Sequence, residues 1–248
     1  MNTFSIIMPV WIIDFELLKL TQATMNSIKN SDDYDKIQEF ILIDNGSPVG
    51  TNYLIGESDI YLRGLMNRGY PWGVNQGLKI ATSDFLVISN NDIRISPNWI
   101  NITEAIFEED EKVGSVHFRM IDYDTPMDLG NETWITGKER WCSSSFFVIR
   151  KKAVPEGLYD ENYGWGSFDD WDLQHRLRHI DDWKSAYTNK AIYQHKHSST
   201  QSKLGAETWR KQSERNREYF KTKFGKYPEE IWEERYPDQM KLSYLPLP

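Results

Sequence analysis

The chain has 248 residues, enough for one large α/β domain or two closely joined halves. Its 37 Asp and Glu residues outnumber 29 Lys and Arg residues, and the net charge of −8 argues against non-specific binding to a nucleic-acid backbone. The single cysteine, Cys142, excludes an intramolecular disulfide, and its strand-like surroundings favour a small core residue over a nucleophile. No apolar window approaches the length of a membrane span and the first apolar run has no basic leader, so we expect a soluble, cytoplasmic protein.

The first part of the chain alternates between strand and helix patterns. Thr3 to Val10 is an apolar run that predicts a buried strand, and Asp14 is placed to cap the helix that follows. The predicted inner face of that helix is formed by Leu18, Thr21, Met25 and Ile28. Glu39 to Ile43 predicts a second strand that stops at a dense turn signal, and Ile60 to Leu62 predicts a short third strand. This alternation predicts a parallel sheet with helices on its faces.

The stretch from Asn67 to Asp92 organises the rest of the chain. Three glycines at four-residue spacing allow a short helix to pack closely, or the backbone to approach a ligand: Gly69, Gly73 and Gly77. Phe85 to Ile88 is a continuous apolar run, which suits a strand buried on both faces. Asp92 follows this strand and is either a solvated turn residue or part of a ligand site at the edge of the sheet.

Polar side chains follow three successive predicted strands: Trp11 and Asp14, Asp44 and Asn45, and Asn90 to Asp92. In a doubly wound sheet these strand ends are neighbours in space. The first strand is not followed by Gly-x-Gly-x-x-Gly, and the sequence has no Gly-x-x-x-x-Gly-Lys-Ser/Thr. Dinucleotide-dependent oxidoreductases and P-loop NTPases therefore lose their main support.

The middle of the chain continues with mixed elements. Ser96-Pro97 predicts a helix start, with Ser as the cap and Pro at the first helical position. Val113 to Ile121 and Ser143 to Ile149 predict strands, and Tyr123 to Arg140 between them predicts a long loop. Ala186 to Gln194 predicts the last strand.

An acidic cluster, Asp169, Asp170 and Asp172, opens a predicted helix just after the turn Gly164-Trp165-Gly166. The predicted inner face of this helix contains Leu173, Leu177 and Ile180. Carboxylates in a first turn are favoured by the helix dipole, so capping is the simple explanation. One carboxylate would suffice for capping, and three beside glycines and tryptophans also fit a catalytic site.

Two features near the C-terminus remain open from the residues alone. His195 and His197 follow the last predicted strand and are either surface residues or ligands. Residues 201–226 carry eight basic and three acidic residues, which predicts a basic amphipathic helix packed on the body with a solvated outer face. A docking surface for an acidic partner is the alternative. The segment from Tyr236 is predicted to be a weakly ordered tail.

The motifs, taken in this order, resemble the GT-A-fold glycosyltransferases of family 2, including rhamnosyltransferase-like members. The resemblance covers about residues 4–200 and rests on Ile6 to Val10, Leu42 to Ser47, Asn67 to Gly77, Asn90 to Asp92 and Asp169 to Leu173. Asn90-Asn91-Asp92 stands where the family has Asp-x-Asp. The Gly-Trp-Gly turn and the acidic segment after it are similar to those of galactosyltransferases.

This resemblance implies a GT-A fold, an α/β architecture with a Rossmann-like nucleotide-binding half and a mixed central sheet. On that basis, residues 1–92 are the nucleotide-sugar-binding half, and residues 93–200 are the acceptor-binding and catalytic half of the same domain. Residues 201–248 are then a C-terminal helical extension and tail.

The resemblance also implies roles for individual residues. It assigns the catalytic base to Asp170, with Asp169 as its acceptor-holding neighbour, and it leaves Asp172 to support the helix start. It assigns metal ligation to Asp92 and His195. The implied acceptor-binding residues are Trp165, Gly166 and Asp169. The implied donor-binding residues are Pro9, Val10, Trp11, Asp44, Asn45, Asn67, Gly73, Asn75, Asn91 and Asp92.

The sequence departs from the family pattern at three places. Asn90 replaces the first Asp of Asp-x-Asp, which leaves metal ligation mainly to Asp92. Trp11-Ile12 replaces the usual Tyr-Asn of the base-contacting segment. Asp169 replaces a Glu and gives a shorter reach with the same charge.

We therefore expect a metal-dependent, inverting glycosyltransferase that uses Mn²⁺ or Mg²⁺ and a nucleoside-diphosphate sugar; inversion is implied by the resemblance alone. A cation neutralises the charge that develops on the leaving diphosphate, and a carboxylate takes the proton of the acceptor hydroxyl. The acceptor is open between a glycan, a lipid-linked sugar, a protein and, disfavoured by the acidic composition, a modified nucleic acid. A nucleotidylyltransferase and a non-catalytic sugar-binding module remain alternatives.

Overall fold

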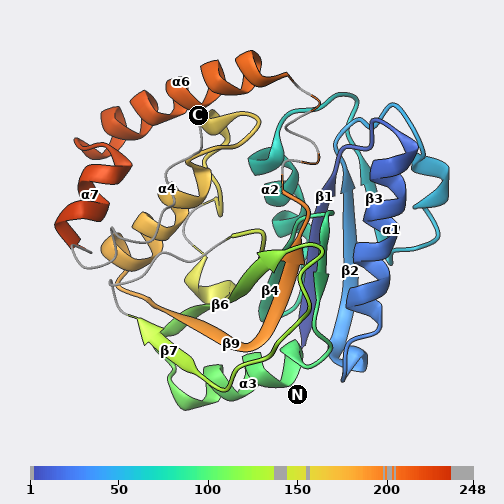
Figure 1. Cartoon of the computed structure of the whole chain (residues 1–248), viewed down its shortest axis with the longest axis horizontal. Helices are drawn as coiled ribbons and strands as arrows, with labels where there is room; N and C mark the ends of the chain where they lie inside the picture. The colour runs from blue at the N-terminus through green and yellow to red at the C-terminus, as the bar shows by residue number, and fades with distance from the viewer. Residues whose placement is uncertain are drawn as a thin grey trace.

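The computed structural model describes residues 3–136, 144–154, 157–197, 199, 203 and 205–235. Cys142, the last part of the predicted loop at residues 137–140 and the predicted tail from Tyr236 lie outside the described residues. The described residues form a sheet with helices on both of its faces (Figure 1).

The first half of the chain has the predicted β-α-β order. Its elements are β1 (Phe4–Val10), α1 (Phe15–Lys29), β2 (Ile37–Asp44), β3 (Ile60–Arg63), α2 (Tyr70–Ile80) and β4 (Phe85–Ser89). The strands pair in the order β3-β2-β1-β4, and every pair is parallel. The Asp14 carboxylate accepts a hydrogen bond from Leu17 N at 2.9 Å, which confirms it as the cap of α1.

The second half makes the sheet mixed, as expected for the GT-A fold. Its elements are β5 (Ile93–Ile95), α3 (Trp99–Glu109), β6 (Val113–Asp122), β7 (Thr133–Thr136), β8 (Phe146–Arg150), α4 (Asp169–His175) and β9 (Lys184–His195). Strand β8 runs antiparallel to β4 and β6, whereas β6 and β9 are parallel. Strands β5 and β7 pair antiparallel with β9, so the described sheet has the order β3-β2-β1-β4-β8-β6-β9-β5 with β7 beside β9.

Two further helices, α6 (Ala206–Phe224) and α7 (Pro228–Arg235), follow the sheet. In Figure 1, α6 lies beside α4 at the upper left of the molecule. Short helical turns are η1 (Tyr34–Lys36), η2 (Thr51–Tyr53), η3 (Lys151–Ala153), η4 (Glu161–Tyr163) and the π-helical turn η5 (Arg176–Ile180). Within the described ranges, no helix combines the length and apolar character needed to cross a bilayer.

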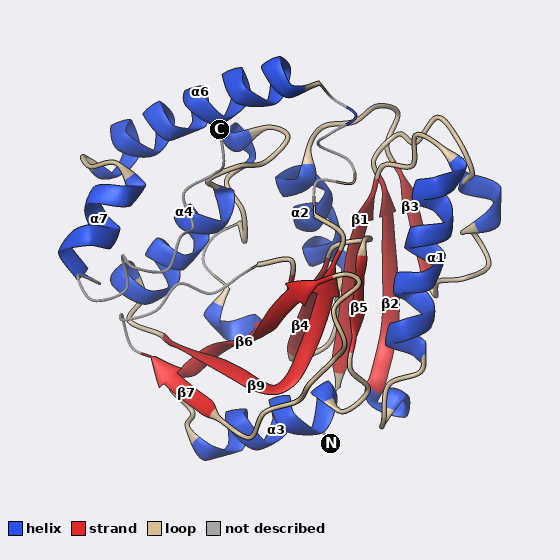
Figure 2. Ribbon diagram, in the orientation of Figure 1, coloured by secondary structure: helices blue, strands red, loops and turns tan. Residues whose placement is uncertain are grey.

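The core lies in two layers, one on each face of the sheet (Figure 2). On one face, α1 and α3 contribute buried side chains such as Met25 and Trp99. On the other face, α2 and α4 contribute Val74 and Leu173. This three-layer packing leaves the ends of the central strands free to carry polar side chains.

The glycines of the central stretch have the packing role that their spacing predicts. A Cβ atom at Gly73 would lie 2.8 Å from Pro9 Cβ, and one at Gly77 would overlap Ile7 of β1. A Cβ atom at Gly69 would overlap the carbonyl group of Gly164. Helix α2 therefore lies close against β1, and its N-cap residue, Gly69, lies against the backbone of the turn before α4.

Three local predictions were wrong. Helix α3 begins at Trp99 with Asn98 as its N-cap, because Ser96 Oγ instead accepts a hydrogen bond from Ile192 N at 3.1 Å. Strand β7 lies inside the segment predicted to be a long loop, where it pairs with β9. Ile180 is exposed, whereas Leu177 is buried as predicted, because the π-helical turn η5 shifts the face on which later residues lie.

Candidate active site

Asp92 and His195 face each other at the edge of the sheet. Asp92 follows β4, and His195 ends β9, where it pairs with Ile93 of β5. His195 Nε2 lies 3.1 Å from Asp92 Oδ1. Asp92 Oδ1 is buried and receives no hydrogen bond from the described residues. A buried carboxylate oxygen is stabilised by a cation or by a proton donor, and at this position the donor could be a proton on His195 Nε2.

These two side chains fit a divalent cation. A carboxylate oxygen and an imidazole nitrogen are ligands that Mn²⁺ accepts, and Mg²⁺ accepts the oxygen. The described residues contain no group of three or more His, Cys, Asp or Glu side chains arranged around one metal position. Asn90 Nδ2 lies 3.5 Å from His195 Nε2, so an amide stands where the family pattern has its first Asp. A cation here would take its remaining ligands from water and from the diphosphate.

The geometry favours His195 over His197 as the ligand. The side chain of His195 is 11% exposed, whereas that of His197 is 49% exposed and lies 3.6 Å from the exposed carboxylate of Asp122. The two imidazole rings are neighbours, with centroids 4.5 Å apart. Burial together with the contact to Asp92 makes His195 the better candidate of the two.

Asp44, at the end of β2, is fully buried and already bonded within the protein. Its Oδ1 accepts from Ser47 N at 2.8 Å and its Oδ2 accepts from the Tyr61 hydroxyl at 2.5 Å. Arg63 Nη1 lies 3.4 Å from Oδ2. Burial, followed by the contact with Asp44, raises the pKa of Tyr61 to about 12, so this hydroxyl keeps its proton at neutral pH. A nucleoside at this site would approach a carboxylate of fixed orientation.

The amides proposed for donor binding all make hydrogen bonds inside the protein. Asn45 bonds Gly69 O and Arg68 N, Asn67 Oδ1 accepts from Gly69 N, and Asn91 donates to Thr21 Oγ1. Both ends of the Asn75 amide bond the main chain of Tyr159, so this side chain joins α2 to the segment before the Gly-Trp-Gly turn. Pro9 and Val10 are buried in β1, and Trp11 is half-buried just after it. Donor contacts by these residues stay predictions.

The turn that leads into α4 has an unusual backbone. Gly164, Gly166, Ser167 and Phe168 all have positive φ angles, and only the first two are glycines. Residues with side chains rarely adopt this conformation, and where they do the position is often functional. Trp165, between the two glycines, is 39% exposed, so its ring is available to a sugar.

Asp169 and Asp170 follow this turn in crowded surroundings. Burial raises the pKa of both carboxyl groups, and the charge of Asp170 raises the pKa of Asp169 further. Asp170 Oδ1 accepts from Trp171 N at 2.9 Å, and part of its side chain stays open to solvent. The N-cap of α4 is Phe168, which makes no side-chain capping bond. The first-turn carboxylate of Asp170 therefore takes over part of the capping that Phe168 does not supply.

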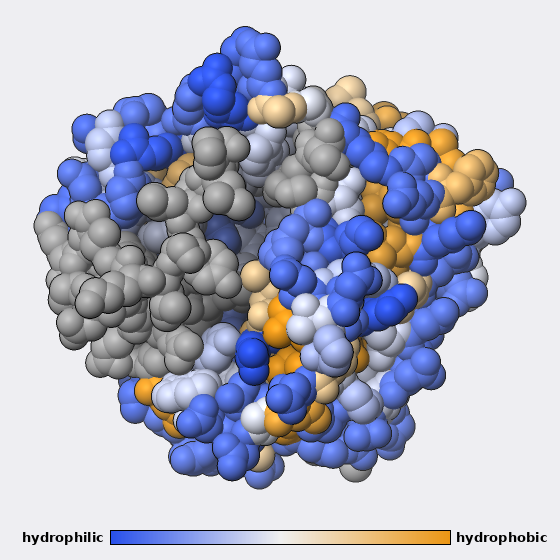
Figure 3. Space-filling model, viewed as in Figure 1, coloured by the Kyte–Doolittle hydropathy of each residue, from blue (hydrophilic) through white to orange (hydrophobic). Residues whose placement is uncertain are grey.

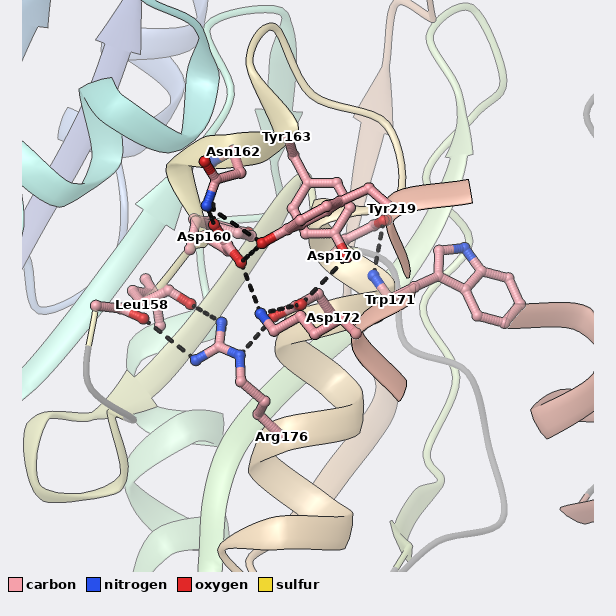
Figure 4. A network of polar contacts seen from close by, with 12 residues as sticks. Leu158, Asp160, Asn162, Tyr163, Asp170, Trp171, Asp172, Arg176 and Tyr219 are labelled. Carbon is pink, nitrogen blue, oxygen red and sulfur yellow. Dashed lines mark hydrogen bonds and ion pairs between the residues drawn. The ribbon is translucent and has the colours of Figure 1, made fainter. Parts of the chain in front are cut away.

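Asp172 makes structural contacts that extend beyond the helix start it was expected to support. It is fully buried and binds three side chains (Figure 4). Its oxygens accept from Arg176 Nε at 2.5 Å, from Lys223 Nζ at 2.6 Å and from the Tyr163 hydroxyl at 3.2 Å. Asp172 therefore joins α4 to α6 and to the turn, and it has no free oxygen for a substrate.

Tyr70 is a residue of the site that the sequence did not point to. Its hydroxyl is buried and has no hydrogen-bond partner among the described residues. Burial raises its pKa well above the usual value, and the charges of Asp169, Asp92 and Asp170 raise it further. The Tyr70 hydroxyl is thus within electrostatic reach of the carboxylate of the candidate metal site and of those at the start of α4. The only hint in the sequence is an aromatic residue directly after Gly69.

Helix α6 is the second part of the site that the sequence did not reveal. It packs on the body with a hydrophilic outer face, visible along the top of Figure 3, as predicted. Asn216 is fully buried against the turn before α4, and Lys223 bonds Asp160 and Asp172. An uncharged Asn within a run of charged residues was the available signal. The alternative of a docking surface for an acidic partner has no support from these contacts.

The model of the family "Glycosyl transferase family 2" matches residues 5–159, which is more than half of the chain. The chain belongs to glycosyl transferase family 2. A search of curated proteins found no match. Membership disfavours the nucleotidylyltransferase alternative. Asp44, which ends strand β2, and Asp92, which follows strand β4, lie within the segment that matches the family model. The residues of α4, β9 and α6 lie beyond it.

Solved structures similar to this glycosyltransferase share its GT-A fold. S. aureus TarS 1-349 has a TM-score of 0.61 and 15% identity, covering 77% of this chain and 59% of that one. The complex of TarS 1-349 with UDP has a TM-score of 0.62, 16% identity and the same coverage. GalNAc-T7 with UDP, GalNAc and Mn²⁺ has a TM-score of 0.60 and 12% identity, covering 78% and 44%. The chain thus spans 59% of the TarS 1-349 chain.

Proposed function

We propose that the protein transfers a sugar from a nucleoside-diphosphate sugar to a hydroxyl acceptor, with inversion at the anomeric carbon and with the help of Mn²⁺ or Mg²⁺. The observation that carries the proposal is the contact of Asp92 with His195 at the edge of the sheet, where Nε2 lies 3.1 Å from Oδ1. Burial raises the pKa of the Tyr70 hydroxyl, and the charges of Asp169, Asp92 and Asp170 raise it further. Family membership and the fold support the same reaction class.

The cation would be held by Asp92 Oδ1 and His195 Nε2, which lie 3.1 Å apart. When bound, it would neutralise negative charge on the diphosphate leaving group. The buried, unbonded state of Asp92 Oδ1 supports this role, because a cation supplies the missing partner. Asn90 beside His195 would hold the imidazole or a bound water without adding a second negative charge.

Asp170 is the proposed base. Its carboxylate takes the proton of the acceptor hydroxyl as the oxygen forms a bond to the anomeric carbon. The bond from that carbon to the diphosphate breaks, and the electron pair leaves with the nucleoside diphosphate. A pKa raised by burial makes this carboxylate a stronger base than an exposed one. Asp169 and the exposed ring of Trp165 are proposed to hold the acceptor, and a single displacement of this kind inverts the anomeric carbon.

A uridine diphosphate sugar is the first donor to test. One TarS structure is described as a complex with UDP-GlcNAc, and GalNAc-T7 is described with UDP and GalNAc. Asp44, at the end of β2, is the proposed contact to the base or ribose, with Pro9, Val10 and Trp11 beside it. The acceptor is proposed to be a glycan, a lipid-linked sugar, a protein or, least favoured by the net charge, a modified nucleic acid.

The deciding experiment measures what is released from a panel of UDP, GDP and dTDP sugars, with and without Mn²⁺. Release of the nucleoside diphosphate that depends on the metal and is lost in Asp170→Asn supports the proposal. Release of pyrophosphate on mixing a nucleoside triphosphate with a sugar phosphate would identify a nucleotidylyltransferase instead. Sugar binding without any turnover would identify a binding module. A thermal-shift panel of UDP, GDP and dTDP, each with and without Mn²⁺, selects the donor base.

A further inference from the structure

The turn before α4 needs outside support to keep its shape. Its φ angles are 61° at Gly164, 115° at Gly166, 76° at Ser167 and 65° at Phe168. Ser167 and Phe168 carry side chains that disfavour this conformation, so it persists only where neighbouring groups impose it. Phe168 O then accepts the backbone bond from Asp172 N at 3.0 Å that starts α4. The turn therefore sets the direction in which the first carboxylates of α4 point.

The side chain of Asn216, on α6, supplies that support. Its Nδ2 donates to three carbonyl oxygens of the turn, those of Tyr163 at 2.8 Å, Gly166 at 2.7 Å and Ser167 at 3.0 Å. Because Nδ2 has only two hydrogens, one of them is shared between two carbonyls. Asn216 Oδ1 accepts from Gln212 Nε2 at 3.2 Å, which fixes the amide in the donating orientation. The side chain is fully buried, so no substrate reaches it.

Other contacts hold α6 in place on either side of Asn216. Toward its N-terminus, Ser213 Oγ lies 3.0 Å from Ser167 Oγ, and Gln212 Nε2 also donates to Tyr163 O at 2.7 Å. Toward its C-terminus, the Tyr219 hydroxyl donates to Asp160 at 2.9 Å, as Figure 4 shows. The helix is thus fixed against the same segment that Asn216 holds, and the amide has little freedom to move away from the turn.

We infer that Asn216 is a positioning residue for the transfer reaction: it holds the turn at residues 164–168 and thereby aims Asp169 and Asp170 at the acceptor. The catalytic part of this inference rests on the proposed function. Asn216 acts only through the backbone of the turn, so its loss moves the carboxylates without touching the donor. A displacement of about 1 Å at a reacting group can lower a rate by about 10²-fold.

The test uses Asn216→Asp and a matched control on the same helix. Asn216→Asp keeps the shape but turns two N–H donors into a carboxylate that faces three carbonyl oxygens, and Asn216→Ala removes the donors without adding charge. The control is Phe220→Leu, because Phe220 is buried against Phe224 and His175 and makes no contact with the turn among those described. All variants are compared at a temperature where each is fully folded.

Three quantities are measured: amide hydrogen exchange over residues 163–172, UDP affinity, and kcat for UDP release from UDP-GlcNAc with Mn²⁺. In both Asn216 variants we expect faster exchange in this segment, a kcat lower by about 10²-fold, and UDP affinity within about twofold of wild type. Phe220→Leu should lower the thermal midpoint and leave segment exchange and kcat near their wild-type values.

Two results would overturn the inference. If amide exchange over residues 163–172 is no faster in the Asn216 variants than in Phe220→Leu, then Asn216 does not hold the turn. Faster exchange with a kcat close to that of wild type would show that the turn does not aim the carboxylates. If wild type releases no nucleoside diphosphate from any donor, the proposed function fails and the catalytic part with it, while the exchange comparison still decides whether Asn216 holds the turn.

Discussion

His195 Nε2 and Asp92 Oδ1 lie 3.1 Å apart, although β9 and β4 are far from each other in the sequence. The antiparallel pairing of β5 with β9, in which Ile93 lies opposite His195, brings them together. A backbone hydrogen bond from Lys196 N to Asp92 O, at 2.9 Å, also holds the segment after β9 against the segment after β4. A cation between these side chains would therefore join two segments that are far apart in the sequence.

Removal of His195 should abolish the dependence of activity on the metal. We expect His195→Ala to lose most of its Mn²⁺-dependent turnover, because Asp92 alone is a weak site for a divalent cation. His197→Ala is the matched control and should keep it, since this side chain is half-exposed. Titration of activity with Mn²⁺ in both variants gives the answer. The opposite pattern would reverse the assignment of the ligand.

Replacement of the proposed base should lower the rate and spare donor binding. Asp170→Asn keeps the size of the side chain and removes the proton acceptor, so kcat should fall by about 10²–10⁴-fold. UDP affinity, measured by titration calorimetry, should hardly change. A variant that keeps more than about a tenth of wild-type turnover would move the role to Asp169. Activity in both Asn variants would place the base elsewhere.

The raised pKa of Asp169 predicts that this residue destabilises the folded protein at neutral pH and that its replacement by Asn relieves the effect. The folded protein holds the Asp169 proton to a higher pH than the unfolded chain does, where the pKa is near 3.8. Above pH 3.8, Asp169 ionises in the unfolded chain while it still holds its proton in the folded protein. This ionisation favours the unfolded chain, so Asp169 lowers the free energy of unfolding as the pH rises. Asp169→Asn should therefore be more stable than wild type at neutral pH and not at about pH 4.

Urea denaturation at the two pH values measures this difference. The gain should come with a loss of turnover, as is common where an active site carries a destabilising group. An equal gain at both pH values would show that the ionisation of Asp169 is not its cause.

Asp44→Asn should weaken UDP binding by on the order of 1–3 kcal/mol, because a charged hydrogen-bond acceptor is lost. Tyr61→Phe is the control: it removes a protein partner of Asp44 and leaves the carboxylate itself in place. UDP affinity is measured by calorimetric titration of both variants at a temperature where each is fully folded. Unchanged affinity in Asp44→Asn with an intact fold would place the donor base somewhere else.

Tyr70→Phe should stabilise the free protein and slow the reaction. A buried hydroxyl without a partner costs about 1–3 kcal/mol, and phenylalanine avoids that cost. We expect kcat to fall as well, because a buried hydroxyl that has no partner among the described residues and is within electrostatic reach of Asp169, Asp92 and Asp170 can donate to a bound ligand. Thermal unfolding and the UDP-release assay measure the two effects. A less stable variant would show that the hydroxyl is bonded in the free protein.

Most of the fold was predictable because its patterns are strong and local. Buried apolar runs predicted β1, β2 and β4, and the acidic Asp14 predicted the start of α1. Strand β7 has four residues in a segment with Pro and Gly nearby, and only its pairing with β9 makes it a strand. The exposure of Ile180 was not predictable either, since nothing in helical spacing announces a π-helical turn.

The candidate site was predictable where it follows strand ends and not where it depends on contacts between distant segments. The pairing of Asp92 with His195 came from the order of the motifs. Asn216 and Tyr70 have no such pattern, because Asn216 bonds carbonyl groups that every residue has, and Tyr70 matters only through what packs around it. The order of residue types along the chain does not show which distant residues pack together in the folded protein.

The backbone contact between Gly69 and Gly164 limits how this enzyme can be recombined with its relatives. No side chain fits at residue 69 while the Gly164 carbonyl lies against it. A start of α2 grafted from a family member with a side chain at this position would collide with the Gly164 carbonyl. Chimaeras designed to change the acceptor should therefore have their crossovers before β3 or after α4, so that the two glycines are inherited together.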